Sequence, residues 1–209
     1  MSLALELYAA ATGNCLRAVI ALEEAGIAYA IRTIDLNSGE HKRPPYTDLN
    51  PAGLVPTLVE TDAEGSRLVL TQSNAIILHV AGRTAGRLIP QFEGAERSVV
   101  LERFMFFITD VIAPSGASFF LGRRNQAEAA GMLEDRMLEA LVGAERFLEQ
   151  SRFMAGDAFS IADIAGFTIT GFAKSKLPWD RLPKLKEWFQ RVELRPGVRR
   201  AYAALGMAH

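Results

Sequence analysis

The chain has 209 residues, of which 49% are apolar and 22% are charged, and its formal net charge at pH 7 is −1. This composition is ordinary for a globular protein with a sizeable core, and the balanced charge gives no indication of a nucleic-acid partner. A single cysteine excludes an intramolecular disulfide framework and fits a reducing compartment. We find neither a signal-peptide pattern nor a run of about 18 apolar residues, so we expect a cytoplasmic protein that does not enter a membrane.

A β-α-β pattern occupies the first part of the chain. Apolar residues alternate along residues 3–11 and again along residues 27–36, which predicts two strands. Between them, apolar residues recur at helical spacing from Leu16 on, and Gly26 follows as a C-cap candidate. A strand, a helix and a second strand in this order favour parallel pairing through a right-handed crossover.

A polar loop rich in proline and glycine follows, and then a second group of elements. Residues 54–60 and 67–72 have the composition of short strands, and the turn between them predicts a hairpin. A helix pattern starts near Ser73, whose side chain suits an N-terminal position. The order β-α-β-loop-β-β-α over residues 1–82 predicts a thioredoxin-like α/β domain.

The second half of the chain shows helical periodicity only. Residues 83–97 contain few large apolar side chains and are predicted to be a linker. Ser160 and Asp163 form a capping-box pattern at the start of one helix, which points to a role in folding. We expect an all-α helical bundle over residues 98–209. Helices are predicted over residues 97–114, 127–151, 159–175 and 182–197.

Two short motifs, taken together with the helical second half, are more specific than any of these patterns alone. A Val-Pro pair, Val55 and Pro56, stands at the start of a predicted strand, and a Gln-Ser pair, Gln72 and Ser73, stands at the start of the next helix. With these motifs in this order, the chain resembles the cytosolic glutathione transferase superfamily over essentially its whole length. The resemblance implies a thioredoxin-like N-terminal domain that binds glutathione and a helical C-terminal domain that contributes the acceptor site.

The N-terminal motif is most similar to that of the bacterial Nu class. Residues 12–14 read Thr-Gly-Asn, and residues 23–26 read Glu-Glu-Ala-Gly near the end of the helix. Other classes of the superfamily place a catalytic Ser at the position of Thr12, a Cys at the position of Asn14, or a Tyr at the position of Tyr8. The resemblance therefore implies that the residue contacting the sulfur of glutathione lies in this stretch.

The chemistry needed from that stretch is the stabilisation of a thiolate. A cysteine thiol has a pKa of about 8.5. Lowering this pKa by about two pH units requires about 2.7 kcal/mol of preferential stabilisation of the anion. One charge-assisted hydrogen bond and a helix N-terminus together supply energy of this order. Thr12 and Asn14 are suitable donors, although both residues could also serve as ordinary helix caps. Cys15 and Tyr8 are the less favoured candidates, since each fits a buried position in the core.

The remaining glutathione contacts follow from the resemblance. A cis peptide bond before Pro56 would leave the backbone of Val55 free to pair with the cysteinyl part of glutathione. The helix start at Gln72 and Ser73 suits the γ-glutamyl carboxylate. The predicted glutathione-binding residues are Thr12, Asn14, His41, Val55, Pro56, Gln72 and Ser73.

The glycine end of glutathione is the part where this chain departs from the family pattern. His41 and Arg43 lie in the polar loop and could meet the glycine carboxylate. Many family members carry Lys or Arg directly before the Val-Pro pair, where this chain has Leu54. The phenylalanine-rich residues 104–120 are expected either to line the apolar acceptor site or to form bundle core.

Three functions are compatible with this sequence. The first is a glutathione S-transferase that activates glutathione, as co-substrate and without a metal, for attack on a small hydrophobic electrophile. The Nu-like motif implies an alternative, a glutathione-dependent disulfide-bond oxidoreductase or peroxidase in which glutathione supplies both sulfurs. The third is a non-catalytic binding protein with the same fold. The resemblance also implies a homodimer.

Overall fold

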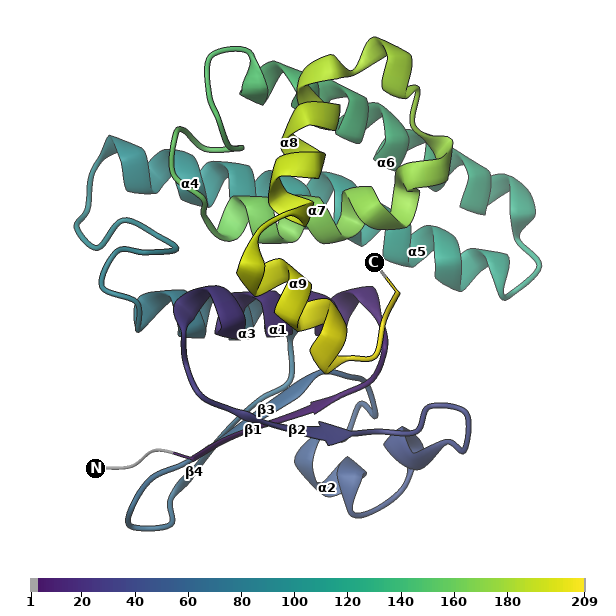
Figure 1. The fold of residues 1–209 in the computed structure, drawn as a ribbon. Helices are drawn as coiled ribbons and strands as arrows, with labels where there is room; N and C mark the ends of the chain where they lie inside the picture. The colour runs from purple at the N-terminus through teal and green to yellow at the C-terminus, as the bar shows by residue number, and fades with distance from the viewer. Residues whose placement is uncertain (1–3, 209) are drawn as a thin grey trace. The chain divides into compact units, whose positions relative to one another are not determined.

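A computed structural model describes residues 4–208 (Figure 1). The chain divides into two compact units. The first unit takes the residues up to Thr84 together with those from Arg195 on, and the second unit takes residues 85–194. The predicted boundaries 1–82, 83–97 and 98–209 remain a prediction, with residues 1–3 and 209 outside the described part. The return of the chain to the first unit at Arg195 is a feature that the sequence patterns did not indicate.

The first unit contains a four-stranded sheet with the strand order β2-β1-β3-β4. β1 pairs in parallel with β2 and antiparallel with β3, which in turn pairs antiparallel with β4. This arrangement confirms the predicted thioredoxin-like fold, including the parallel β-α-β unit and the hairpin. The strands are β1 (Ala4–Ala9), β2 (Ala30–Thr33), β3 (Thr57–Thr61) and β4 (Arg67–Leu70).

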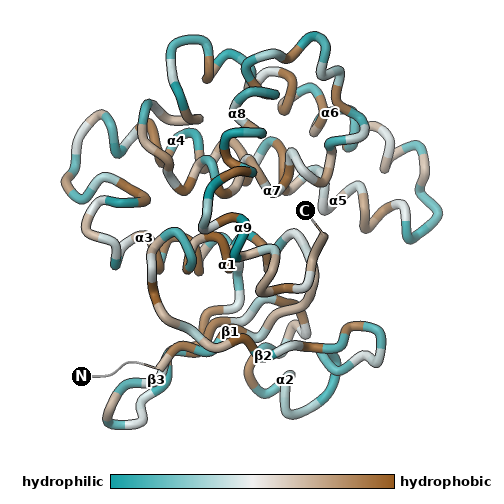
Figure 2. Tube along the Cα trace, in the orientation of Figure 1, coloured by the Kyte–Doolittle hydropathy of each residue, from teal (hydrophilic) through white to brown (hydrophobic). Residues whose placement is uncertain are grey.

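Helices lie on both faces of this sheet. Figure 1 shows α1 (Gly13–Ala25) and α3 (Ser73–Gly82) on one face and the short helix α2 (Tyr46–Leu49) on the other. The alternation along β1 explains the division, since Leu5, Leu7 and Ala9 are buried whereas the intervening side chains are half-buried. Figure 2 shows the hydrophobic character of β1 within the sheet, in contrast to the hydrophilic turn that joins β3 and β4. Along β1 the sheet therefore has a fully packed face toward α1 and α3 and a less buried face on the side of α2.

α1 is the central helix of this unit. Its residues Cys15–Leu22 are all buried, so the helix has no face toward solvent along this part. Gly26 ends it in the left-handed conformation with φ 68°, and its N–H donates to the carbonyls of Glu23 and Leu22. The predicted glycine C-cap is thereby confirmed, because a residue without a side chain adopts this conformation at little cost.

The last helix, α9 (Pro196–Ala204), packs against α1 within the first unit. Arg195 forms two hydrogen bonds with the carboxylate of Glu24, at 2.9 and 2.6 Å, and Arg200 Nε donates to Glu23 Oε2 at 2.6 Å. The two glutamates of the Glu-Glu-Ala-Gly motif thus bind the C-terminal helix. A helix was predicted over residues 182–197, and α8 (Pro183–Glu193) confirms most of it. Its predicted end was wrong, because the proline at residue 196 stands in the first turn of α9 and starts that helix.

The second unit is built of helices. Its elements are α4 (Ala95–Phe106), the π-helical turn η2 (Phe107–Ile112), α5 (Ala113–Gly122), α6 (Ala127–Gly143), η3 (Ala144–Leu148), α7 (Ile161–Ala173), η4 (Lys174–Lys176), η5 (Trp179–Arg181) and α8 (Pro183–Glu193). α7 is the central helix, since nearly all its residues are buried. The predicted helical bundle is confirmed for this unit.

The start of α7 is fixed by a buried carboxylate. The capping box of Ser160 and Asp163 is present, with Asp163 Oδ2 accepting from Ser160 N at 2.9 Å. Asp163 Oδ1 accepts further hydrogen bonds from Met154 N at 2.9 Å and from Trp188 Nε1 at 2.8 Å. Because this carboxylate is fully buried and its oxygens accept from three segments of the unit, its role is in folding.

α4, η2 and α5 form one continuous helix over residues 95–122. By length and composition alone, this helix could cross a bilayer, and 22% of its most apolar window is buried. One such helix is weak evidence for a membrane span, because core helices of globular domains have the same length and composition.

Candidate functional site

The start of α1 places a hydroxyl group at the predicted sulfur position. Thr12 is the N-cap residue, with φ −133° and ψ 154°, and its Oγ1 accepts from Cys15 N at 3.3 Å. A hydroxyl group has one donor and two acceptor positions, so this cap uses an acceptor position only, and the hydrogen of Thr12 can be directed to Cys15 Sγ or to a ligand. The capping role and the donor role that the sequence left as alternatives are therefore compatible with each other.

Asn14 lies in the first turn of α1 with an exposed side chain. Its Oδ1 accepts a hydrogen bond from Arg17 Nη1 at 3.2 Å. Since the guanidinium group carries only donors, this contact requires the oxygen of the amide on the side of Arg17. The Nδ2 group of Asn14 is then the part of the amide that remains for a ligand, and it is a donor.

Cys15 is completely buried in the first unit. Its Sγ accepts a hydrogen bond from Ala10 N at 3.4 Å. Burial raises the pKa of the Cys15 thiol, although the hydrogen bonds from Ala10 and Thr12 oppose this effect. Burial and a raised pKa both oppose a nucleophilic role, because the thiolate is the reactive form and must be accessible.

Leu5 and Leu7 lie on the sheet face that is directed toward α1 and α3, and Tyr8 lies on the opposite face. Its ring is 6.1 Å from that of Tyr46, centroid to centroid. With Tyr46 and Arg67 it lines a pocket of about 340 Å³ on this accessible face. The structure thus associates Tyr8 with α2, and it joins Tyr8 by no described hydrogen bond to Thr12 or Asn14.

The Val-Pro pair forms an open segment of backbone. The peptide bond between Val55 and Pro56 is cis, as the resemblance implied. The preceding carbonyl, that of Leu54, accepts hydrogen bonds from Tyr46 Oη at 2.5 Å and from Asn50 Nδ2 at 2.7 Å. Among the described residues, no hydrogen bond involves the backbone of Val55. This segment therefore offers a donor and an acceptor to an added strand-like ligand.

The start of α3 is a second helix N-terminus in the same unit. Gln72 is the N-cap residue without a side-chain cap, and Ile76 N donates to its carbonyl at 2.9 Å. Ser73 is buried, and its Oγ accepts from Arg17 Nη1 at 3.2 Å. Neither α1 nor α3 has an acidic residue in its first turn. Both helix ends therefore present N–H groups and a positive dipole end, which favour anions.

Arg17 connects the two helix ends, a role that the sequence patterns did not indicate. Only 3% of it is exposed, and its Nη1 also lies 3.5 Å from Asn74 Oδ1, so that it contacts side chains of both helices. Burial lowers the pKa of Arg17 to about 10, which still leaves it protonated at neutral pH. The available signal was a single cation inside an otherwise apolar stretch, residues 15–22. A charged residue is seldom fully buried unless it is paired with other polar groups.

The polar loop places its candidates unequally. His41 lies in η1 (Glu40–Lys42), and its Nδ1 is buried with no hydrogen-bond partner among the described residues. Arg43 Nη2 donates to Ser38 O at 2.9 Å, within the loop itself. Leu54 is 55% exposed and contributes no charge. Of the two candidates for the glycine carboxylate, His41 thus has the ring nitrogen that needs a partner.

The phenylalanine-rich stretch divides into two parts. Phe104 and Phe107 are fully buried in the core of the second unit. Phe119 and Phe120 are 63% and 54% exposed and carry the guanidinium groups of neighbouring arginines over their rings. The contribution of this stretch to an acceptor site stays a prediction for its exposed part, whereas its first part is bundle core.

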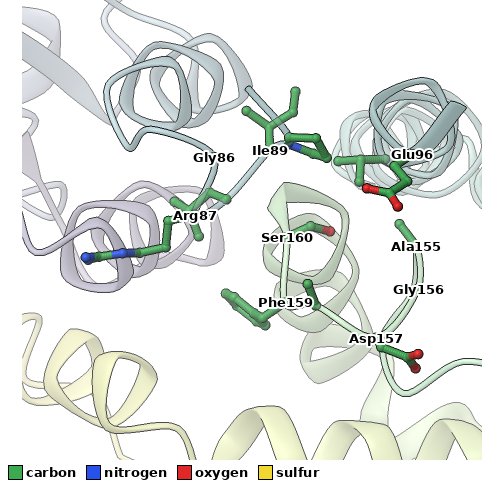
Figure 3. Close-up of a pocket in the computed structure, with 13 residues that line it drawn as sticks. Gly86, Arg87, Ile89, Glu96, Ala155, Gly156, Asp157, Phe159 and Ser160 are labelled. Carbon is green, nitrogen blue, oxygen red and sulfur yellow. The ribbon is translucent and has the colours of Figure 1, made fainter. Parts of the chain in front are cut away.

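A pocket of about 410 Å³ lies in the second unit (Figure 3). It is lined by residues 86–90 and 155–160 with Glu96 and Val100, and none of the predicted glutathione-binding residues belongs to it. Figure 3 shows the carboxylates of Glu96 and Asp157 near this pocket and the Arg87 side chain directed away from them. Across residues 4–208, no group of His, Cys, Asp and Glu side chains has the arrangement of a metal site.

Two family models match the chain, one in its first half and one in its second half. Residues 13–83 match the N-terminal domain of glutathione S-transferases. Residues 109–204 match the C-terminal domain of glutathione S-transferases.

Individual relatives agree with these models. Glutathione S-transferase 1 of Triticum aestivum is 32% identical over an alignment 209 residues long, gaps included, that covers 90% of this chain and 88% of the wheat protein. The disulfide-bond oxidoreductase YfcG of Escherichia coli is 27% identical, with 94% of each chain covered. A solved glutathione transferase from Burkholderia graminis, with two glutathione molecules bound per subunit, superimposes with a TM-score of 0.82 at 27% identity, over 95% of this chain and 87% of that one. The chain therefore belongs to the cytosolic glutathione S-transferase superfamily.

Proposed function

We propose that this protein binds glutathione in its first unit and activates the thiol as a thiolate for attack on a small hydrophobic electrophile. One observation carries the proposal. Two helix N-termini without acidic residues hold Thr12, Asn14 and Ser73, and the buried cation Arg17 touches side chains at both ends. Such an arrangement favours a ligand with a negative charge at each of two points, as glutathione has at its sulfur and its γ-glutamyl carboxylate.

The sulfur is assigned to the start of α1. The Thr12 hydroxyl and the Asn14 Nδ2 group each provide a hydrogen bond to the thiolate, which they stabilise relative to the thiol. Hydrogen bonds to charged groups contribute about 1.5 to 3 kcal/mol, and the end of a helix adds about 0.3 to 1 kcal/mol. Their sum covers the roughly 2.7 kcal/mol needed to lower the thiol pKa by about two.

The rest of glutathione is assigned to the neighbouring segments. The cysteinyl backbone pairs with that of Val55 beside Pro56, in the manner of an added strand. The γ-glutamyl carboxylate takes the N–H groups at the start of α3, with Gln72 and Ser73. The glycine carboxylate takes His41. This assignment is supported by the free backbone of Val55 and by the unpartnered Nδ1 of His41.

In the conjugation reaction, the thiol proton leaves to solvent and the thiolate attacks an electrophilic carbon. A carbon–sulfur bond forms, and the bond from that carbon to its leaving group breaks, with the electron pair departing on the leaving group. No sulfur of the protein takes part, which agrees with the burial of Cys15.

A disulfide-directed reaction at the same site is the second candidate. The thiolate of one glutathione attacks a disulfide, which forms a mixed disulfide and releases one thiolate. A second glutathione then attacks the mixed disulfide, so that glutathione disulfide and the second thiol leave. The name of the Escherichia coli relative and the two glutathione molecules of the Burkholderia structure favour this candidate. The nearness to the Nu class rests on the Thr-Gly-Asn motif.

A pair of assays separates the two reactions. Turnover of a chlorinated aromatic acceptor is measured against turnover of hydroxyethyl disulfide, both with glutathione. We expect measurable conjugation; rapid disulfide turnover with negligible conjugation would move the assignment to the oxidoreductase. Calorimetry at about millimolar glutathione detects binding with a free energy of about −4 kcal/mol. If glutathione fails to bind under these conditions, the enzymatic assignment is refuted and a non-catalytic binding protein with the same fold becomes the favoured function.

Two further proposals concern assembly and location. We expect a homodimer in the cytoplasm. The dimer is what the family resemblance implies, and Leu68 and Leu78 on the first unit and Met105 on the second are exposed apolar side chains. Sedimentation velocity measures the mass in solution, and a monomer at micromolar concentration would contradict the dimer.

A further inference from the structure

We propose that Arg17 is a positioning residue that turns the donor groups of Asn14 and Ser73 toward glutathione and thereby makes the sulfur site and the carboxylate site one coupled anion-binding unit. This inference rests on the proposed function. It adds a residue from the buried interior of α1 to a site that is otherwise made of surface loops and helix ends.

The position of Arg17 follows from helix geometry. Asn14 precedes Arg17 by three residues in α1, and long side chains on a helix run back toward its N-terminus. The guanidinium group therefore reaches the first turn of its own helix, where Nη1 lies 3.2 Å from Asn14 Oδ1. α1 packs against α3, and the same Nη1 lies 3.2 Å from Ser73 Oγ in the first turn of that helix.

The chemistry of these contacts determines the polarity of both groups. A guanidinium group carries five N–H donors and no acceptor, so every oxygen within hydrogen-bond distance of it must accept. Asn14 is then held with its carbonyl oxygen inward and its NH₂ group available to the ligand. Ser73 likewise receives the hydrogen bond on its oxygen, which leaves its own hydrogen to be donated elsewhere. Both side chains become donors toward the ligand, which matches a thiolate and a carboxylate.

The charge of Arg17 acts in the same direction. A cation near a helix N-terminus is unfavourable, because the positive end of the helix dipole already lies there. Arg17 is nevertheless placed beside two such ends, it is 3% exposed, and no acidic residue stands in either first turn. An anion bound at these ends offsets this unfavourable potential, so the arrangement is more favourable when occupied than when empty.

A purely structural role for Arg17 makes different predictions. If Arg17 served only to pack α1 against α3, its replacement would lower the free energy of unfolding and leave the ionisation of bound glutathione unchanged. Two measurements distinguish the roles. The first is the pKa of the bound thiol, which depends on the orientation of Asn14. The second is the energetic coupling between Arg17 and Asn14 in their effects on that pKa.

The test compares Arg17→Met, Arg17→Lys and the control Arg83→Met in the full chain. Arg83 pairs with Glu60 in the same unit and contacts none of the proposed site residues through a described interaction. The pKa of the bound thiol is measured by the ultraviolet absorbance of the thiolate as a function of pH. Affinity for S-methylglutathione, which has no ionisable thiol, reports the carboxylate contacts separately.

We expect Arg17→Met to raise the pKa of the bound thiol by about one and to weaken S-methylglutathione about tenfold. Arg17→Lys keeps the charge without the forked geometry, so it should give intermediate values. Arg83→Met should match the unmodified protein in both measurements. In the double variant of Arg17→Met and Asn14→Ala, the rise in thiol pKa should be smaller than the sum of the two single effects.

The inference is overturned if folded Arg17→Met retains the thiol pKa and the S-methylglutathione affinity of the unmodified protein. It is also overturned if the effects of Arg17→Met and Asn14→Ala on the thiol pKa are fully additive. If Arg17→Met does not fold, Arg17→Lys provides the test. A thiol pKa and an S-methylglutathione affinity of Arg17→Lys that equal those of the unmodified protein would contradict the positioning role. Failure of the unmodified protein to bind glutathione would instead overturn the proposed function.

Discussion

Replacement of Thr12 by Val is the most direct perturbation of the proposed sulfur site. Valine has nearly the shape of threonine and lacks Oγ1, so it removes both the cap to Cys15 N and the hydroxyl donor. Loss of an N-cap costs about 1 kcal/mol of stability. Loss of one hydrogen bond to a thiolate costs about 1.5 to 3 kcal/mol, which corresponds to a rise of about one to two in the pKa of bound glutathione.

These two effects are measured separately. Denaturant unfolding gives the loss of the cap, and the pH dependence of the thiolate absorbance gives the loss of the donor. Thr12→Ser retains the hydroxyl, so its stability and its pKa of bound glutathione should equal those of the unmodified protein. Ser160→Ala removes the side-chain cap of α7 in the other unit and should lower stability without altering the thiol pKa.

One result for Thr12→Val would refute the donor role of its hydroxyl group. If Thr12→Val lowers the stability by about the value of a cap but leaves the pKa of bound glutathione unchanged, the hydroxyl group is a cap only. A rise in the pKa for Asn14→Ala in the same experiment would then assign the sulfur contact to the amide.

Three further results are expected. Cys15→Ser should retain glutathione-dependent turnover because no step uses a protein sulfur; a loss of turnover with intact glutathione binding would replace the mechanism with a mixed disulfide. Burial raises the pKa of Cys15, so the native state holds the thiol proton more tightly than the unfolded chain, and stability should fall as the pH rises above about 8.5. Cys15→Ala should lessen this fall in denaturant titrations, and an unchanged pH dependence would contradict the assignment. Gly197→Ala should cost about 1 to 3 kcal/mol, since its Cβ would lie 2.6 Å from the Glu24 oxygen that Arg195 holds. Gly131→Ala, which meets nothing within 4 Å, is the control, and equal thermal stability of the two variants would refute the close contact.

Local signals were sufficient for most of the fold. The alternation along β1, the glycine at the end of α1 and the capping box at Ser160 and Asp163 each depend on neighbouring residues, and each is present in the structure. The cis bond before Pro56 came from the family resemblance and is also present. Sequence signals of this kind succeed because hydrogen bonds at helix ends and side-chain periodicity along strands act over a few residues.

The boundaries of the last helices required tertiary information. A helix pattern that contains Pro196 is compatible with an end or with a new start at that residue, and the proline alone does not decide between them. The pairs of Arg195 with Glu24 and of Arg200 with Glu23 join residues that are far apart in the chain. These contacts place α9 in the first unit and explain the two adjacent glutamates at the end of α1.

The candidate site divides in the same way. The sequence by itself determined that Thr12 and Asn14 stand at a helix start and that Gln72 and Ser73 stand at another, because capping and dipole effects belong to the individual helix. Only the tertiary structure decided that Cys15 is buried, that Tyr8 faces α2, and that Arg17 joins the two helix ends. The reason is physical: burial and the orientation of an amide depend on which side chains another segment brings within hydrogen-bond distance, and that information is absent from local spacing.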